Sequence, residues 1–337
     1  HFERSPMYHC LLTDHLLDLL AVLPRDVPLE KDIQRVLAKA ITTAEYLKNP
    51  QEELPLLGDS ALGVAPSGKE LRAKWNDLVP ESLPATPVDK PLCELDEHIV
   101  YRDRQTRDWM LIDAGPLGPA FLGAHQHSDL FGCELSLRGV PIVCDGGAGI
   151  YREGEERAAL RSPQEHAVLT IDGQGPCDPW KSFRMARPPR RISHRILWKN
   201  NEFLIQMRHD GFRFAGVLHE RKVRISPDRR SFSILDKIFP VTKSSARNRV
   251  RTVAIHLPLA PEIDAQVKGN EAVLYQHGTD GDPLAVVTFS SNTGTPAVLT
   301  REGLRWEQFG KARKRTILIA QVIASGRIVI RCDIRGL

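Results

Sequence analysis

The residues best suited to chemistry lie between positions 124 and 166. This stretch holds three histidines, two aspartates and a tyrosine among short apolar runs and glycine turns. Side chains two positions apart on a strand point to the same side, so an extended backbone would place His125, His127 and Asp129 on one face. Polar groups on a rigid β scaffold are typical of a functional site. If the protein is an enzyme, we expect its active site here.

Three residues of this stretch are candidate metal ligands. Asp145 follows the apolar run 140–144, and His166 begins the alternating run 166–171, which predicts a strand. Together with His127 they would give a zinc ion three nitrogen or oxygen ligands and leave a fourth position open. The spacing alone is unspecific, because a short His-x-His sequence is more often a hydrogen-bonded polar pair than a metal site.

The elements that would position these residues begin with helices. Apolar residues recur at helical spacing over 12–23 and 33–47, and Pro28 favours a helix start before the second run. A loop at 54–60 and a shorter helix at 68–78 follow. These helices are too few to form a stable domain by themselves. We therefore expect them to complete a larger helical array.

After a proline-rich segment at 79–90, short alternating runs predict antiparallel strands. The clearest strand pairs are 99–101 with 109–112, and 217–225 with 232–238. Further strands are predicted at 192–207, 250–257, 272–275, 284–289, 316–323 and 327–334. We therefore predict an α+β multidomain chain, with a helical region at 1–85 and a large antiparallel β-sandwich at 86–337.

Charge and composition limit the classes of binding partner that we expect. The chain has 337 residues and a net charge of +4, and no apolar stretch is long enough to span a bilayer, so membrane insertion is not expected. Positive residues cluster after the histidine stretch, which favours an acidic ligand. The first cluster is Arg184, Arg187, Arg190, Arg191 and Arg195, and the second is Arg208, Arg213, Arg221, Lys222 and Arg224. No nucleic-acid-binding motif accompanies them, so nucleic acid is not an expected partner.

Two further features concern the chain as a whole. Its six scattered cysteines predict neither a zinc ribbon nor a dense disulfide framework, and they leave one or two disulfides and the redox compartment open. It begins at His1 without an initiator methionine or a signal segment, as expected of a part of a longer protein. The sequence leaves the oligomeric state open.

Several motifs follow one another along the chain. They are the opening His-Phe-Glu-Arg-Ser-Pro-Met-Tyr-His, the segment Ala-His-Gln-His-Ser-Asp at 124–129, Asp-Gly-Gly at 145–147 with Tyr151, Arg161-Ser162 with His166, His-Asp-Gly-Phe at 209–212, and His-Glu-Arg at 219–221. In this order they resemble the heparinase II/III-like polysaccharide lyases. The resemblance implies that the helical region is the C-terminal part of an (α/α) toroid, followed by the β-sandwich. It also implies β-elimination on a uronate-containing polysaccharide. A base removes the C5 proton, the adjacent carboxylate is neutralised, and the C4 oxygen leaves with help from an acid.

The resemblance also assigns roles to individual residues. His125 resembles the site histidine of the family, and Tyr151 resembles a site tyrosine. His127, Asp145 and His166 resemble its zinc ligands, with the metal as an organiser of the site. His1 and Glu3 occupy the place of a carboxylate-neutralising residue and its supporting acid.

A toroid tyrosine for proton transfer has no clear counterpart. Tyr46 is the nearest candidate and Tyr8 is another, although both could be helix packing residues. Asp59 lies close to the expected position but could equally be a loop or capping residue.

Three functions follow, from different classes of protein. The first is a lyase that cleaves an acidic polysaccharide and is bacterial and periplasmic or extracellular, because such polymers lie outside the cytoplasm. The second is a non-catalytic protein of the same fold that binds acidic glycans or assembles exopolysaccharide. The third is an unrelated metalloenzyme that acts on small molecules on a β scaffold, suggested only by the His-x-His sequence and Asp145. Fold resemblance alone does not decide between them, nor does it identify the polymer or the cutting pattern.

Overall fold

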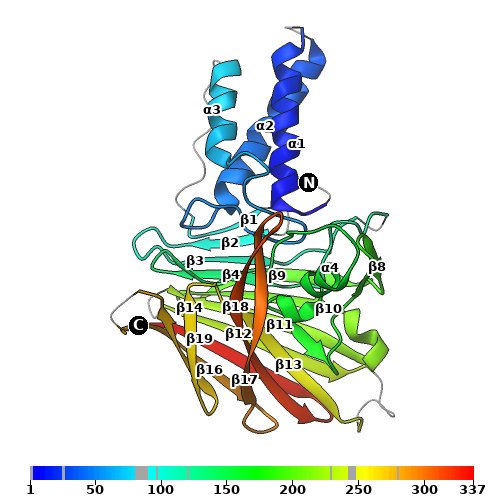
Figure 1. The fold of residues 1–337 in the computed structure, drawn as a ribbon, viewed down its shortest axis with the longest axis vertical. Coiled ribbons are helices and arrows are strands. Elements are labelled where there is room, and N and C mark those ends of the chain that lie inside the picture. The colour runs from blue at the N-terminus through cyan, green and yellow to red at the C-terminus, as the bar shows by residue number, and fades with distance from the viewer. Residues whose placement is uncertain are drawn as a thin grey trace.

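The computed structural model describes residues 3–24, 27–79, 90–95, 98–119, 121–227, 230–241, 248–278 and 281–337. Three helices stand at one end of a larger β region, and the first of them starts where the two parts meet (Figure 1). The predicted order of helices followed by antiparallel strands is confirmed. The predicted boundary at 85 and 86 falls outside the described residues, so it stays a prediction.

The helices begin where the sequence supplies starting signals. They are α1 (Pro6–Val22), α2 (Pro28–Leu47) and α3 (Gly68–Leu78). Proline opens α1 and α2, at a position where its missing N–H removes no helical hydrogen bond. Ser67 and Glu70 form a capping box at the start of α3. The helices pack on one another through buried apolar side chains that include Leu17, Leu37 and Trp75.

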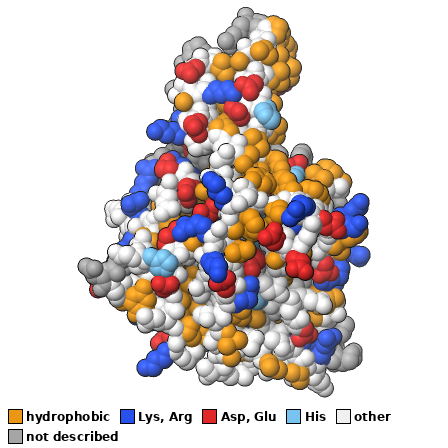
Figure 2. Space-filling view, viewed as in Figure 1, with side chains coloured by type: hydrophobic (Ala, Val, Ile, Leu, Met, Phe, Trp, Pro, Cys, Tyr) orange, Lys and Arg blue, Asp and Glu red, His pale blue; other side chains and the backbone are white. Residues whose placement is uncertain are grey.

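Apolar side chains also lie on the outside of the helices. The exposed ones are Leu12, Leu19 and Val22 of α1, and Leu29 and Val36 of α2. Figure 2 shows apolar side chains along the side of the helical part formed by α1. None of the described helices is both long and apolar enough to cross a membrane.

The described strands form three larger antiparallel sheets and one two-stranded ribbon. The five-stranded sheet has the order β1 (Leu92–Leu95), β2 (His98–Arg102), β3 (Trp109–Asp113), β4 (Cys133–Leu137), β5 (Val140–Val143). The four-stranded sheet has the order β17 (Ala297–Gln308), β18 (Lys311–Ala324), β13 (Arg251–Pro258), β6 (Leu169–Ile171).

The largest sheet has eight strands, in the order β14 (Ile263–Lys268), β15 (Glu271–Gln276), β16 (Pro283–Ser291), β19 (Ile328–Gly336), β12 (Ser231–Pro240), β11 (Val217–Ser226), β10 (Glu202–His209), β9 (Ile192–Lys199). The ribbon pairs β7 (Asp178–Trp180) with β8 (Arg184–Ala186). Three short helices lie in the connections: α4 (Glu155–Leu160), η1 (Pro163–Glu165) and η2 (Gly211–Ala215).

One apolar core joins the three larger sheets. It includes Ile112 of β3, Ile255 of β13 and Ile234 of β12, all at most 1% exposed. A second cluster lies on the other face of the five-stranded sheet, where Leu47 of α2 packs with Trp109 of β3. The five-stranded sheet is therefore covered on both faces, and it fixes the helices relative to the rest of the β region.

Most predicted elements are found close to their predicted places. The helix 68–78, the pair β2–β3 and the hairpin β11–β12 are confirmed. The long strand β17 was missed because its exposed half carries Thr300, Arg301 and Glu302, which break the apolar alternation. All six cysteines are described and free.

Candidate active site and metal site

The segment 124–129 is a loop and not a strand, so the prediction of a shared strand face was wrong. Its two histidines nevertheless meet at one carboxylate. His125 Nδ1 lies 3.1 Å from Oδ2 of Asp59, and His127 Nε2 lies 2.9 Å from Oδ1 of the same residue. Asp129 is buried but makes no such contact with Asp59. A distant acidic side chain therefore organises the histidine loop.

Asp59 lies in the loop between α2 and α3, which docks directly on the histidine loop. The Asp59 N–H donates to the carbonyl oxygen of His125 over 3.1 Å. The preceding Gly58 has φ of +53°, and a Cβ there would lie 2.7 Å from that carbonyl oxygen. Only glycine fits this close approach of two backbones.

A buried guanidinium completes the surroundings of Asp59. Arg157 of α4 donates to both oxygens of Asp59, over 2.5 and 2.8 Å, and to the carbonyl oxygen of Ser182. Asp59 is 0% and Arg157 1% exposed. Burial raises the pKa of Asp59, but hydrogen bonds from His125, His127 and Arg157 outweigh it and hold the pKa well below its usual range. Asp59 is therefore a fixed negative charge.

Two tyrosines lie beside His125, one from each part of the chain. The Tyr8 ring of α1 is 4.2 Å from the His125 ring, centroid to centroid. The hydroxyl oxygens of Tyr8 and Tyr151 are 3.0 Å apart. Burial, the Asp59 charge and the hydrogen bond with Tyr8 raise the pKa of Tyr151 above its usual value, so its hydroxyl stays protonated at neutral pH.

The structure distinguishes between Tyr46 and Tyr8, the two candidates for a proton-transfer tyrosine from the helical region. Tyr46 donates its hydroxyl to the carbonyl oxygen of Lys90 and packs with Arg102, so it joins the helices to the β region. Tyr8 is the one at the histidine loop. The predicted Glu3 is also there, with Oε2 3.7 Å from Nε2 of His125. His1 lies outside the described residues.

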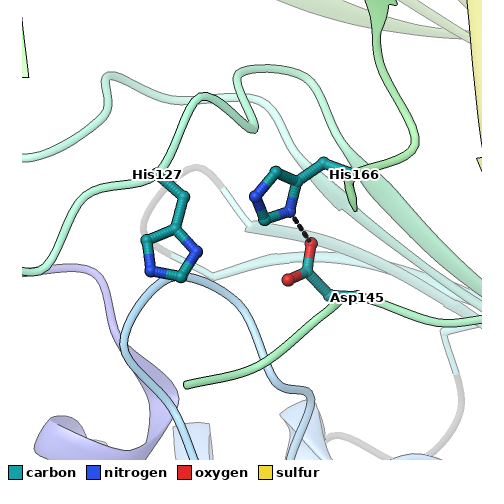
Figure 3. Close-up of side chains that lie close together, drawn as sticks. All are labelled: His127, Asp145 and His166. Carbon is teal, nitrogen blue, oxygen red and sulfur yellow. Dashed lines mark hydrogen bonds and ion pairs between the residues drawn. The ribbon is translucent and has the colours of Figure 1, made fainter. Parts of the chain in front are cut away.

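The three candidate metal ligands are brought together as predicted, although the backbone differs. His127, Asp145 and His166 are all buried, and their possible ligand atoms lie within 4.8 Å of one another (Figure 3). Asp145 follows β5, as predicted. The prediction that His166 begins a strand was wrong, because it directly follows the short helix η1 and β6 starts only at Leu169.

Two ring nitrogens in this cluster have no hydrogen-bond partner among the described residues. They are Nδ1 of His127 and Nε2 of His166, both buried. The opposite nitrogens are occupied, since Nε2 of His127 bonds Asp59 and Nδ1 of His166 lies 2.8 Å from Asp145 Oδ2. When both rings are neutral and donate their N–H to a carboxylate, the two unpartnered nitrogens carry lone pairs. Buried lone pairs beside a carboxylate fit a cation.

The electrostatics of the cluster differ between the two histidines. Burial lowers the pKa of His127 to about 4. Burial also lowers the pKa of His166, but the charge of Asp145 outweighs it, and the pKa is raised above its usual value. Glu134 supports the cluster, because its Oε1 accepts hydrogen bonds from the N–H groups of Asp145 and Leu56. Burial raises the pKa of Glu134 to about 7.

A second buried polar chain involves the motifs at 209–212 and 219–221. Nε2 of His209 lies 2.7 Å from Nδ1 of His219, and Nε2 of His219 lies 2.7 Å from Oδ1 of Asp236. Arg221 holds both oxygens of Asp236 and donates to the carbonyl oxygens of Phe131 and Ala167. This chain is outside the His125 cluster but braces the segments next to it.

Several of the clustered cations are paired with acidic side chains of the same chain. Arg187 pairs with Asp178, Arg208 with Glu220, and Arg221 with Asp236. The clusters in the sequence therefore overstate the positive charge available to a ligand. Sequence reasoning also missed Arg157 and Glu134, because neither belongs to a motif and each acts on residues more than ten positions away.

Comparisons with known proteins agree with this architecture. The family described as heparinase II/III-like, C-terminal, matches residues 99–332. No curated protein sequence matches. Among solved structures, a heparinase III aligns with a TM-score of 0.78 and 17% identity, over 100% of this chain and 52% of its own. The heparan sulfate lyase HepC from Pedobacter heparinus aligns with a TM-score of 0.77 and 18% identity, over 100% and 53%.

This chain therefore spans about half the length of the solved structures that it matches. At these identities the structural likeness shows the fold alone. The sequence family covers most of the β region and includes all three candidate metal ligands and both site residues His125 and Tyr151. The chain belongs to the heparinase II/III-like family.

Proposed function

We propose that the protein is a polysaccharide lyase that cleaves a uronate-containing acidic polysaccharide by β-elimination and leaves an unsaturated uronate end. The observation that carries the proposal is the convergence of Tyr8, His125 and Tyr151, with the Tyr8 ring on His125 and the two hydroxyl oxygens 3.0 Å apart. β-Elimination needs a proton acceptor and a proton donor next to the same sugar ring. The three side chains supply both.

His125 is suited to accept the C5 proton. The Asp59 carboxylate accepts the hydrogen bond of Nδ1, which fixes the tautomer and leaves Nε2 as the basic nitrogen. Once Nε2 holds the proton, the imidazolium is stabilised by Asp59 on one side and by Glu3, 3.7 Å from Nε2, on the other. Asp59 and Glu3 therefore act as supports for the base.

The tyrosine pair is suited to protonate the leaving oxygen. Tyr151 keeps its proton at neutral pH and can donate a hydrogen bond to the Tyr8 oxygen over 3.0 Å, which stabilises the negative charge left on Tyr8. Tyr8, which is partly exposed, donates its own proton to the C4 oxygen as the bond to that oxygen breaks. The proton count closes, because one proton moves to His125 and one leaves the tyrosine pair. His1 remains a proposed carboxylate-neutralising residue.

We also propose that His127, Asp145 and His166 hold zinc. The two unpartnered ring nitrogens and the carboxylate match the donor set that zinc prefers. When bound, zinc supplies a positive charge that holds these three segments in place. Asp59 links this cluster to the base, since its two oxygens bond His127 and His125. Loss of the metal should therefore disturb His125 through Asp59.

The helical region is proposed to belong to an (α/α) toroid. The apolar residues on the outer sides of α1 and α2 support this, because they suit packing against further helices. An acidic polysaccharide would lie against the junction of helices and β region, where Tyr8 and His125 meet. Since such polymers lie outside the cytoplasm, we place the protein in the periplasm or outside the cell.

The test is the ultraviolet absorbance of unsaturated uronate while the purified protein is incubated with glycosaminoglycans and alginate-like polyuronides. We expect a rise with one class of polymer that is absent in His125→Ala and kept in His277→Ala. His277 is an exposed histidine that pairs with Asp264, away from the site, so it controls for loss of any histidine. No rise with any polymer, from folded and metal-loaded protein, would favour the non-catalytic glycan-binding function instead.

A further inference from the structure

A hollow of about 660 Å³ lies beside the histidine loop and takes no part in the proton transfers described above. One wall is formed by Ala124 and Gln126, the neighbours of His125 in the sequence. The other is the ribbon β7–β8, which contributes Trp180, Phe183 and Arg184. Apolar residues that include Leu117, Leu122 and Met185 line the rest.

The hollow and the proposed active site share one side chain, Phe183. The Phe183 ring lies 6.5 Å from the His125 ring and 5.5 Å from the Tyr151 ring, centroid to centroid. Phe183 therefore has one side on the catalytic cluster and one on the hollow. A polymer bound at His125 has this hollow directly beside it.

Buried arginines hold the ribbon wall in place. Arg161, which is 0% exposed, donates to the carbonyl oxygens of Lys181, Arg184 and Gln126 over 2.8 to 3.0 Å. Arg157 donates to the carbonyl oxygen of Ser182 while it holds Asp59. The turn of the ribbon is thus tied to the same framework as the histidine loop. A wall held in this way loses little conformational freedom on binding.

The surface of the wall combines a half-exposed aromatic ring with positive charge. Trp180 is 47% exposed. Lys181 Nζ lies 5.8 Å and the Arg184 guanidinium carbon 5.5 Å from the centre of the Trp180 ring. No carboxylate occurs among the described residues that line the hollow. Within the described part of the chain, neither cation has an ion-pair partner.

We propose that this hollow is a subsite for a second anionic sugar residue of the same polymer. Trp180 stacks on the C–H face of the sugar ring, and Arg184 and Lys181 bind its carboxylate or sulfate group. The aromatic ring recognises an apolar sugar face, and the cations complement a negative charge. The position of the subsite along the polymer rests on the proposed function. The binding chemistry rests on the hollow itself.

Binding can be measured without cleavage in the His125→Ala protein. Isothermal titration calorimetry with an acidic oligosaccharide, and with a neutral oligosaccharide of equal length, gives the dissociation constants. We expect Trp180→Ala and Arg184→Gln, each added to His125→Ala, to weaken binding of the acidic oligosaccharide about tenfold. The neutral oligosaccharide should bind weakly to all variants.

Trp198→Ala is the matched control, because Trp198 is 54% exposed on β9 and packs on Phe203 instead of lining the hollow. It should leave the dissociation constant unchanged. Circular dichroism checks that each variant is folded. Unchanged affinity in both Trp180→Ala and Arg184→Gln would overturn the subsite, even if the protein with His125 intact cleaves the polymer. Affinity that depends on Trp180 and Arg184 without any cleavage supports the subsite and refutes the lyase.

Discussion

Replacing Asp59 with asparagine should both destabilise the protein and impair its site. Asp59→Asn keeps the size of the side chain but removes the negative charge that Arg157, His125 and His127 share. Arg157 would keep its charge in the interior without a counter-charge, which costs about 3–5 kcal/mol. With an unfolding entropy of about 2.1 cal/mol/K per residue over 337 residues, Tm falls by about 4–7 °C.

Activity should fall further than stability explains. Without the carboxylate, the Nδ1 proton of His125 is no longer held and the imidazolium loses its buried counter-charge, so turnover drops about 100-fold or more. Thermal unfolding by circular dichroism and turnover at a temperature where the variant is folded separate the two effects. Asp236→Asn is the matched control, because Asp236 is also buried and also pairs with an arginine and a histidine. It should lose similar stability but keep most of the turnover.

A double variant tests the physical cause. Asp59→Asn with Arg157→Gln removes the lone buried cation, so part of the lost stability should return while turnover stays low. The stability lost by the double variant is compared with the sum of the losses in Asp59→Asn and Arg157→Gln. If the two are equal, an unpaired Arg157 is not the source of the instability. If Asp59→Asn keeps normal turnover, Asp59 does not orient the base.

Three further predictions concern the metal, the tyrosines and pH. His127→Ala should lower zinc content and Tm more than His125→Ala, which should chiefly lower turnover; elemental analysis and thermal unfolding measure this. Tyr8→Phe should abolish most of the absorbance rise, whereas Tyr46→Phe should act on Tm alone, because its hydroxyl bonds Lys90. Burial lowers the pKa of His256 from 6.5 to about 4, so its contribution to stability is complete above pH 6.5 and is lost as pH falls. The stability advantage of wild type over His256→Gln should therefore shrink by about 2 kcal/mol between pH 7 and pH 5, as measured by urea unfolding.

Each of these predictions has an outcome that contradicts it. Equal zinc loss from His125→Ala and His127→Ala would remove the division of roles between the two histidines. Tyr8→Phe with wild-type turnover would exclude Tyr8 as the proton donor. Parallel stability curves for wild type and His256→Gln from pH 7 to pH 5 would show that His256 is not held neutral by burial.

Structural features that depend on residues close together in the sequence could be predicted from it. The helix at 68–78 was predicted because its apolar spacing and Ser67 cap lie within a few residues of one another. The grouping of His127, Asp145 and His166 also followed from sequence, with help from the family resemblance. Their backbone did not, because loop geometry at 124–129 depends on distant contacts such as the one between Gly58 and the His125 carbonyl.

The role of Asp59 could not be deduced from its neighbours in sequence. A Gly-Asp-Ser segment is typical of any turn, and the histidines that Asp59 contacts are 66 and 68 positions away. The role of Arg157 could not be deduced for a similar reason, because it lies in a charged segment whose composition is typical of a solvated surface. Only the packed structure shows that this one cation points inward.

The position of Asp59 also bears on how the family can evolve. Tyr8, Glu3 and Asp59 come from the helical region, whereas His125 and Tyr151 come from the β region. Recombination that exchanged one region for that of a distant relative would separate His125, the proposed base, from the carboxylate of Asp59 that holds its ring. We therefore expect the two regions to be inherited together, and the turn of the β7–β8 ribbon with them, because Arg157 holds both Asp59 and Ser182.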